Sequence, residues 1–172
     1  MSDPLGLLTW TTFGAVAAMT LGGGVLTVTL RNLFHAVLGL VVSLLGVAGV
    51  FLMLASEFVA VIHVLIYVGA IVTLFLFVIM LTHRIDSAEE PQTSRQWFAA
   101  LILGAGFFAM AVSALLRAPW AVASPPVEAA SVETLGREML TTHVLAFEAV
   151  SLLLIVALVG AVTLARREET RP

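Results

Sequence analysis

The chain has 172 residues, of which 60% are hydrophobic and only 11% are charged, whereas a soluble domain carries about 25% charged residues. Such a chain cannot cover itself with a polar surface in water, and its mean hydropathy of +1.10 indicates a membrane protein. The net charge of -3 argues against a nucleic-acid-binding protein. The absence of cysteine excludes disulfides, thiolate metal sites, cysteine-ligated iron–sulfur clusters and a cysteine nucleophile.

Five apolar segments are long enough to cross a bilayer, which requires roughly 20 residues per helix. The expected helices cover residues 5–30, 33–55, 58–82, 97–116 and 143–165. The sequence therefore predicts an all-α, polytopic membrane protein with five transmembrane helices in a single membrane domain, residues 1–172. The N-terminus has no basic region before its first apolar segment, so we expect a retained helix rather than a removable signal peptide.

The breaks between the first three segments are very short, Arg31-Asn32 and Ser56-Glu57. Connections of this length force neighbouring helices to run antiparallel, so the first three helices are expected to form a compact hairpin stack. The segment "VETLGREMLTT" (132–142), ahead of the last helix, has the pattern of a short amphipathic helix at the membrane surface.

The arginine positions predict the orientation, because cytoplasmic loops of membrane proteins carry an excess of basic residues. If the N-terminus lies outside, six arginines are cytoplasmic and two are external. The cytoplasmic set is Arg31, Arg84, Arg95, Arg166, Arg167 and Arg171, and the external set is Arg117 and Arg137. The sequence thus predicts an external N-terminus, a cytoplasmic C-terminus, a cytoplasmic loop at 83–96 and an external loop at 117–142.

Glycines gather within three of the expected helices and predict close helix packing. They are Gly22, Gly23 and Gly24 in the first helix, Gly39, Gly46 and Gly49 in the second, and Gly104 and Gly106 in the fourth. The triple glycine is also a point at which the first helix could bend.

Ionisable side chains inside the apolar segments are few, and a charge at the bilayer centre costs about 2.5–3.5 kcal/mol on insertion scales. His63 and Glu148 each lie five residues into a helix that enters from the predicted outer face, so a contact between them is possible. Structural roles are equally open: a hydrogen-bonded ring for His63, and an interfacial or structurally paired carboxylate for Glu148. His35 opens the second helix and is expected to be interfacial.

Tyr67 and Gly69 lie well inside the third segment, within "YVGAI". A buried tyrosine hydroxyl needs a partner, and Gly69 stands among valine, isoleucine and threonine residues that are poor helix formers in water. We therefore expect a π-bulge, or other irregular hydrogen bonding, within residues 65–73 on a face covered by protein. The sequence shows no catalytic, metal-binding or cofactor-binding motif.

Residues 31–81 resemble the J subunit of bacterial NADH–quinone oxidoreductase, respiratory complex I, whose mitochondrial counterpart is NADH dehydrogenase subunit 6. The residues that carry the resemblance are Arg-Asn-Leu-Phe-His-Ala at 31–36, Ser-Glu-Phe-Val-Ala at 56–60, Tyr-Val-Gly-Ala-Ile at 67–71, the Phe-rich stretch at 74–81 and the closing helix around Glu148. Two positions depart from the family pattern. Leu33 replaces a usual proline, and His63 stands where relatives carry glutamine, glutamate or an apolar residue, so a carboxylate role is not carried over to position 63.

The resemblance implies a non-redox membrane-arm subunit of a proton-translocating NADH–quinone oxidoreductase in the bacterial cytoplasmic membrane. This chain would bind no cofactor and hold no complete active site, while the whole complex would use FMN, iron–sulfur clusters, NADH and quinone. Its implied partners are the A, H, K and antiporter-like subunits and the lipid bilayer. The implied role is a third helix whose rotation makes or breaks a water path, with Tyr67, Gly69, His63 and Glu148 as candidate residues.

Two other classes of function stay open: a structural spacer subunit, and a stand-alone channel or antiporter component. A stand-alone carrier is expected to show an internal repeat or several buried charges, and this sequence has neither. A spacer has no need of His63, Tyr67 and Glu148 within lipid.

Overall fold

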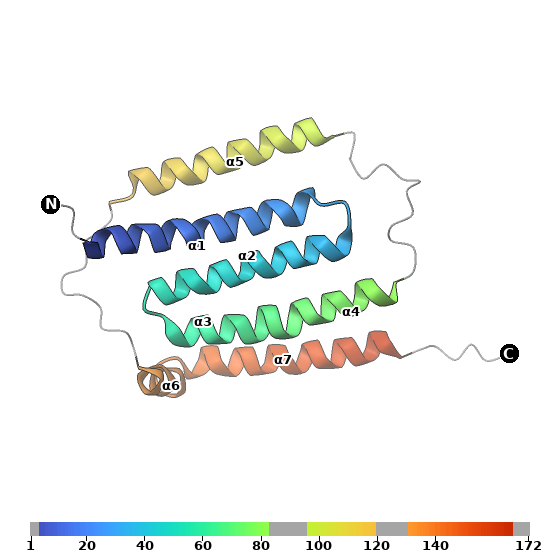
Figure 1. The fold of residues 1–172 in the computed structure, drawn as a ribbon. Helices are drawn as coiled ribbons and strands as arrows, with labels where there is room; N and C mark the ends of the chain where they lie inside the picture. The colour runs from blue at the N-terminus through green and yellow to red at the C-terminus, as the bar shows by residue number, and fades with distance from the viewer. Residues whose placement is uncertain (1–3, 83–95, 120–130, 167–172) are drawn as a thin grey trace. The chain divides into compact units, whose positions relative to one another are not determined.

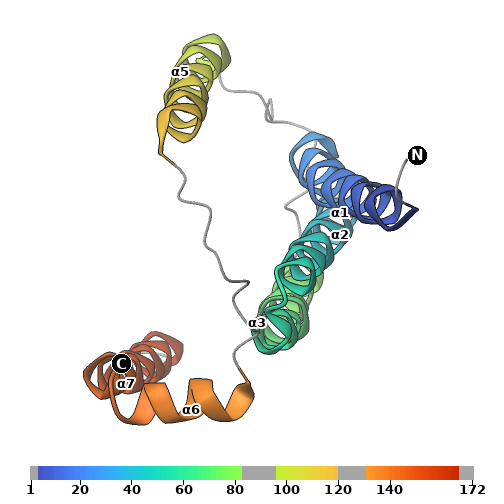
Figure 2. The same cartoon turned by 90° about the vertical axis from the view of Figure 1, so that its left-hand side faces the viewer.

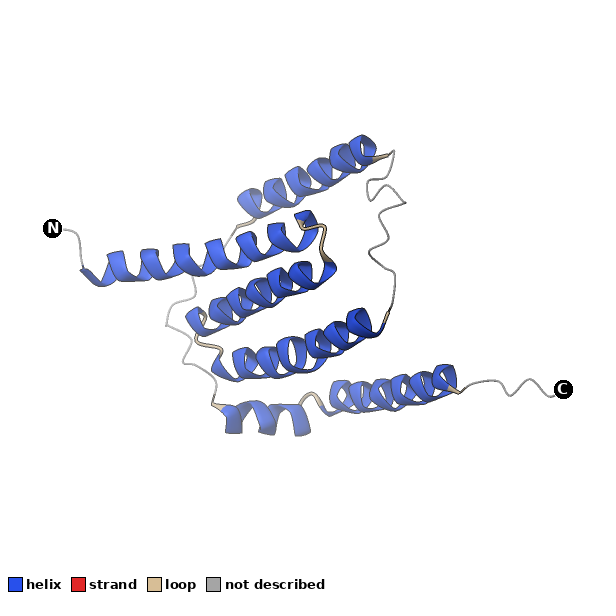
Figure 3. Ribbon diagram, turned by 45° about the vertical axis from the view of Figure 1, so that its right-hand side comes forward, coloured by secondary structure: helices blue, strands red, loops and turns tan. Residues whose placement is uncertain are grey.

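A computed structural model describes residues 4–82, 96–119 and 131–166, and these are helical apart from short turns (Figure 3). Residues 83–95 of the expected loop at 83–96, and residues 120–130 of the expected loop at 117–142, lie outside the described residues. The chain divides into two units, Met1–Pro126 and Val127–Pro172, and each is described by itself. The helices are α1 (Pro4–Thr29), α2 (Leu33–Met53), α3 (Glu57–His63), the π-helix η1 (Val64–Val72), α4 (Thr73–Leu81), α5 (Trp97–Arg117), α6 (Val132–Leu140) and α7 (Val144–Ala165).

Five of these helical stretches are long and apolar enough to cross a membrane, which confirms the prediction of an all-α protein with five spans. The third span is continuous over Glu57–Leu81 and consists of α3, η1 and α4. The expected boundaries differ from the observed ones by one or two residues; the largest difference is at α2, which ends at Met53 rather than at residue 55. The orientation stays a prediction, since four of its arginines, 84, 95, 167 and 171, lie outside the described residues. The single membrane domain is likewise still a prediction.

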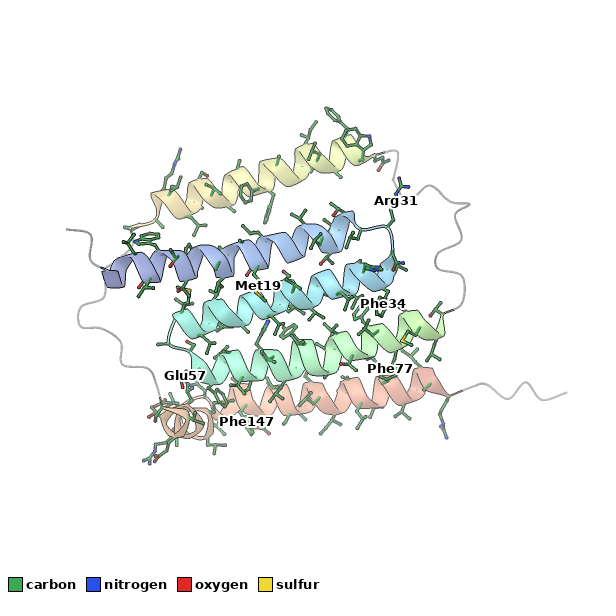
Figure 4. All side chains as sticks on the ribbon, viewed as in Figure 1. Met19, Arg31, Phe34, Glu57, Phe77 and Phe147 are labelled. Carbon is green, nitrogen blue, oxygen red and sulfur yellow. The ribbon has the colours of Figure 1, made fainter. Side chains whose placement is uncertain are left out.

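The first three spans lie side by side and run antiparallel, with α2 in the middle (Figures 1 and 2). This confirms the hairpin stack predicted from the short connections. Arg31 and Glu57 lie beyond opposite ends of α2 (Figure 4), so the apolar length between them carries no charge. The first connection also starts α2, because the Asn32 side-chain oxygen accepts hydrogen bonds from the backbone N–H groups of Phe34 and His35, at 3.0 and 3.3 Å.

Small residues bring α1 and α2 into close contact. A Cβ added to Gly46 would lie 2.7 Å from the backbone nitrogen of Thr20, and one added to Gly23 would lie 2.8 Å from the carbonyl oxygen of Gly39. The Ser43 hydroxyl donates a hydrogen bond to the Thr20 carbonyl oxygen across the interface at 2.8 Å. These contacts confirm the predicted packing role for the glycines of α2, and α1 continues as one helix through its triple glycine.

The turn between α2 and α3 closes with two backbone hydrogen bonds. The Ala55 N–H donates to the Leu52 carbonyl at 3.0 Å, and the Ser56 N–H donates to the Phe51 carbonyl at 2.9 Å. This is the Schellman pattern of a helix C-terminus, in which the residue after the cap adopts a left-handed conformation. Here that residue is an alanine with φ of 55° rather than the usual glycine.

The second unit contains α6 and α7. The Ser131 hydroxyl caps α6 by accepting a hydrogen bond from the Thr134 N–H at 3.2 Å. The helix expected within residues 132–142 is therefore present, and its place at the membrane surface is still an expectation. A three-residue turn, 141–143, joins it to the apolar helix α7.

Candidate functional site

The middle of the third span is π-helical over nine residues, Val64–Val72. This segment overlaps the interval 65–73 in which irregular hydrogen bonding was expected. In a π-helix the N–H groups bond to carbonyls five residues earlier rather than four, and such segments are rare and often found at functional positions. Gly69 lies within this segment, and the closest atom to a Cβ added there would be the Val64 carbonyl oxygen, five residues earlier, at 3.6 Å.

Gly69 is exposed on the surface of this chain, unlike the glycines of the α1–α2 interface. The contact at 3.6 Å is ordinary van der Waals contact. A Cβ at position 69 therefore clashes with none of the described residues.

His63 ends α3 immediately before the π-helical segment, and aromatic rings lie on two sides of it. Its imidazole stacks on the ring of Tyr67, with centroids 4.6 Å apart and an interplanar angle of 27°. The ring of Phe51, from α2, lies 5.5 Å away at 59°. Nε2 of His63 is buried and has no hydrogen-bond partner among the described residues. Leaving a buried polar atom unpaired costs about 1–3 kcal/mol, so this atom needs an explanation beyond packing.

Tyr67 is 47% exposed, and its hydroxyl has no hydrogen-bond partner among the residues that the structure describes. The structure thus brings His63, Tyr67 and Gly69 together on one stretch of the third span. Phe51 was not expected at this site. Its sequence environment is uniformly apolar, and only the packing of α2 against the third span reveals its contact with His63.

Glu148 lies in α7 and is exposed within its own unit. Its backbone carbonyl accepts a hydrogen bond from the Ser151 hydroxyl at 2.7 Å. Because Glu148 and His63 belong to different units, their contact is still a prediction. His35 is exposed in the first turn of α2, with its ring edge-on to Phe34 at 6.0 Å, in agreement with a position near a helix end.

The described residues contain no group of three or more histidine, aspartate or glutamate side chains that could hold a metal ion. They also contain no buried charged side chain. The features that set the site apart are the unpaired imidazole nitrogen, the phenol stacked on it and the π-helical backbone that follows.

Five apolar spans, close packing of α1 on α2 and an irregular third span define a polytopic membrane protein. The family model of NADH-ubiquinone/plastoquinone oxidoreductase chain 6 matches residues 23–164. The chain belongs to this family, which makes it a membrane subunit of an NAD(P)H–quinone oxidoreductase-type enzyme complex, as the sequence resemblance predicted.

Individual relatives agree with this family. The chain is 39% identical over 160 residues to NAD(P)H-quinone oxidoreductase chain 6 of Leptolyngbya boryana, covering 91% of this chain and 79% of the relative. It is 35% identical over 158 residues to the protein of the same name from Nostoc sp., covering 91% and 78%. It is also 32% identical over 163 residues to F(420)H(2) dehydrogenase subunit J of Methanosarcina mazei, covering 92% of each chain.

Proposed function

We propose that this subunit contributes to the central water and proton path of its complex, and that its third span couples quinone reduction to proton pumping by changing helical register. The observation that carries the proposal is the π-helical segment Val64–Val72 directly after the buried, unpaired Nε2 of His63. In this proposal the complex lies in the bacterial cytoplasmic membrane. The partners of the chain are the A, H, K and antiporter-like subunits.

The backbone of η1 supplies a physical means of switching. An α-helix advances about 100° per residue, so returning one π turn to α geometry rotates α4 by about 100° relative to α3. The change replaces one set of backbone hydrogen bonds with another and does not simply break them. The free energies of the two registers can therefore lie within a few kcal/mol of each other. Rotation would move Tyr67 and the exposed surface of Gly69. It would therefore change which groups water can reach.

The polar groups at the junction support the same role. A buried imidazole nitrogen without a protein partner is a suitable hydrogen-bond site for a water molecule. The Tyr67 hydroxyl, also without a partner among the described residues, stands one helical turn further on. A water chain between them would give both groups partners and would be lengthened or broken when the helix rotates.

The names of the relatives differ in the electron donor, NAD(P)H in two cases and F(420)H(2) in another. A subunit that is shared across donors is suited to a task downstream of donor oxidation. We infer that the cofactors of the complex, FMN, iron–sulfur clusters, NADH and quinone, are bound by other chains. The alternatives are a structural spacer subunit and a stand-alone channel or antiporter component.

The deciding experiment compares Gly69→Leu with Leu76→Ile, a mild change in α4 of the same span. Among the described residues, the nearest atom that a Cβ at position 69 meets is the Val64 carbonyl oxygen, at 3.6 Å. We expect the Gly69→Leu complex to assemble, because most of the packing surface of the subunit is unchanged. A bias of about 1.4 kcal/mol toward one register changes the ratio of the two registers about tenfold, so quinone reduction and coupled proton pumping should both fall.

Both activities are measured on assembled complexes in membrane vesicles, with NADH as donor and a pH-sensitive dye as the pumping readout. Equal pumping and turnover of the two variants would mean that the third span is only a spacer. Proton conduction by the purified chain alone in liposomes would favour the stand-alone channel instead.

A further inference from the structure

The helices α6 and α7 meet at a fixed corner. In Figure 1 α7 is seen along its length and α6 end-on, whereas in Figure 2 α6 is seen from the side, so the two helices lie crosswise. The His143 N–H donates to the Glu138 carbonyl at 2.9 Å, and the Thr141 N–H donates to the Arg137 carbonyl at 3.0 Å. The Thr141 hydroxyl donates to the same Arg137 carbonyl at 2.8 Å. These bonds satisfy the end of α6 and fix its direction relative to α7.

The two faces of α6 differ in polarity. Val132, Leu135 and Met139 follow the i, i+3, i+7 spacing that forms one apolar stripe on a helix. Glu133 and Arg137 lie on the opposite side and form an ion pair at 3.3 Å. Within its own unit the stripe is mostly uncovered, since Val132 is 60% exposed and Met139 is 43% exposed.

The neighbouring helix indicates what covers the stripe. α7 has 22 residues, of which Glu148 is the one charged residue, and it is long and apolar enough to be a candidate membrane span. A helix that lies crosswise at the end of a spanning helix, three residues away, lies in the plane of the membrane at the level of the headgroups. A helix with one apolar and one charged face is suited to that boundary.

We propose that α6 is an interfacial anchor whose stripe of Val132, Leu135 and Met139 rests in the boundary between lipid headgroups and acyl chains, while Glu133 and Arg137 face water. Because the corner is fixed by hydrogen bonds, the anchor also sets the depth of α7. Glu148 follows His143 by five residues, which places it about 8 Å into the span at 1.5 Å per residue. The anchor therefore holds the Glu148 carboxylate at a constant depth. This proposal concerns the second unit alone and does not depend on the role of the third span.

The natural chain has no cysteine, so each introduced cysteine is the only thiol of this subunit. We would place spin labels at Val132→Cys and Met139→Cys, with Glu133→Cys and Arg137→Cys as matched controls on the other face. The labelled complexes are reconstituted in nanodiscs of phosphatidylcholine and phosphatidylglycerol. Collisions with oxygen, which concentrates in lipid, are compared with collisions with a water-soluble nickel chelate.

The expected result is a several-fold higher ratio of oxygen to nickel collisions at positions 132 and 139 than at 133 and 137. A high nickel collision rate at all four positions would place the stripe in water and overturn the proposal. Exclusion of both reagents at 132 and 139 would mean that another subunit covers the stripe, which would also overturn it.

The depth-setting part has its own test. Met139→Asp places a charge in the stripe, and Glu138→Asp is the matched control outside the stripe. In each background, Glu148→Cys reports its depth through its labelling rate with a membrane-impermeant charged thiol reagent. We expect a several-fold change of this rate with Met139→Asp and none with Glu138→Asp. Equal rates in the two backgrounds would show that α6 does not set the depth of α7.

Discussion

The imidazole of His63 stacks on the phenol of Tyr67, four residues later, with the ring centroids 4.6 Å apart and the planes 27° from parallel. The pair straddles the point where α3 ends and the π-helical segment begins. Phe51 contacts the imidazole from α2 and offers no polar atom. The ring is thus held in place by aromatic contacts, while its buried Nε2 has no protein partner among the described residues. The packing contacts of the ring can therefore be tested separately from any role of its nitrogen.

The variant His63→Phe tests that separation, because it keeps an aromatic ring between Phe51 and Tyr67 and removes the nitrogen. If the nitrogen has no role beyond packing, its removal should leave the free energy of unfolding unchanged or raise it by about 1 kcal/mol, because an unpaired buried polar atom disappears. We expect normal assembly together with fewer protons pumped per quinone reduced. The ratio is measured in membrane vesicles at matched turnover.

The control for this variant is His35→Phe, which replaces an exposed histidine in the first turn of α2. We expect His35→Phe to pump like the natural protein. If both variants retain the natural ratio of protons to electrons, His63 is a packing residue and does not take part in the proton path.

The five spans could be predicted from the sequence because length and hydropathy determine them almost alone. The end of α2 could not. Ala55 is a strong helix former, so local propensity extends the helix to residue 55, yet the Schellman hydrogen bonds and a φ of 55° end it at Met53. The contact of Phe51 with His63 was equally hidden, since it depends on how two apolar helices pack. Near Gly69 the sequence offers β-branched residues and a glycine, which weaken an α-helix and made irregular hydrogen bonding an expectation there; the π-helical span Val64–Val72 overlaps that stretch.

The α1–α2 interface should be far more sensitive to added methyl groups than the rest of α1. In Gly46→Ala the new Cβ would meet the Thr20 backbone nitrogen at 2.7 Å, so the backbone must move. Overpacking of this kind destabilises by about 1–3 kcal/mol. The matched control is Gly22→Ala, where an added Cβ meets no described atom outside its own stretch of helix within 4 Å and a small gain in helix stability is expected. SDS-induced unfolding of the purified chain in mixed micelles, followed by circular dichroism, measures both. Equal stabilities would contradict the close approach of the two helices.

Ala55→Gly should stabilise the protein. A left-handed conformation costs a non-glycine residue about 1–2 kcal/mol, and the greater freedom of glycine in the unfolded chain cancels about 0.4–1 kcal/mol of the gain. We expect a net increase of about 0.5–1 kcal/mol in the free energy of unfolding, from the same SDS titration. Ala48→Gly, at a buried position inside α2, should lower the free energy of unfolding. A loss of stability in both variants would refute the strained turn.

The predicted orientation can be tested with reporter fusions after Arg171. The arginine distribution predicts that this end lies in the cytoplasm. A fluorescent protein that matures only in the cytoplasm should therefore be bright there, and alkaline phosphatase, which folds only outside, should be inactive. Active phosphatase at this position would reverse the orientation and exchange the sides of all loops.

Glu148 should face protein or water in the assembled complex rather than acyl chains. Within its own unit its side chain is exposed, and the ion pair seen among the described residues of that unit joins Glu133 to Arg137 instead. A carboxylate left in the hydrocarbon costs about 2.5–3.5 kcal/mol. If Glu148 faced lipid, Glu148→Leu would relieve that cost and stabilise the complex. If it meets a polar group of another subunit, the same change leaves that group unpaired, which is destabilising by about 1–3 kcal/mol. We expect the second outcome, seen as a lower temperature of dissociation on native gels.

The companion variant Glu148→Gln keeps the shape of the side chain and one accepting oxygen, so it should restore assembly while its proton pumping stays low. A Glu148→Leu complex that is more heat-stable than the natural one and pumps normally would mean that the carboxylate faces lipid and has no part in the proton path.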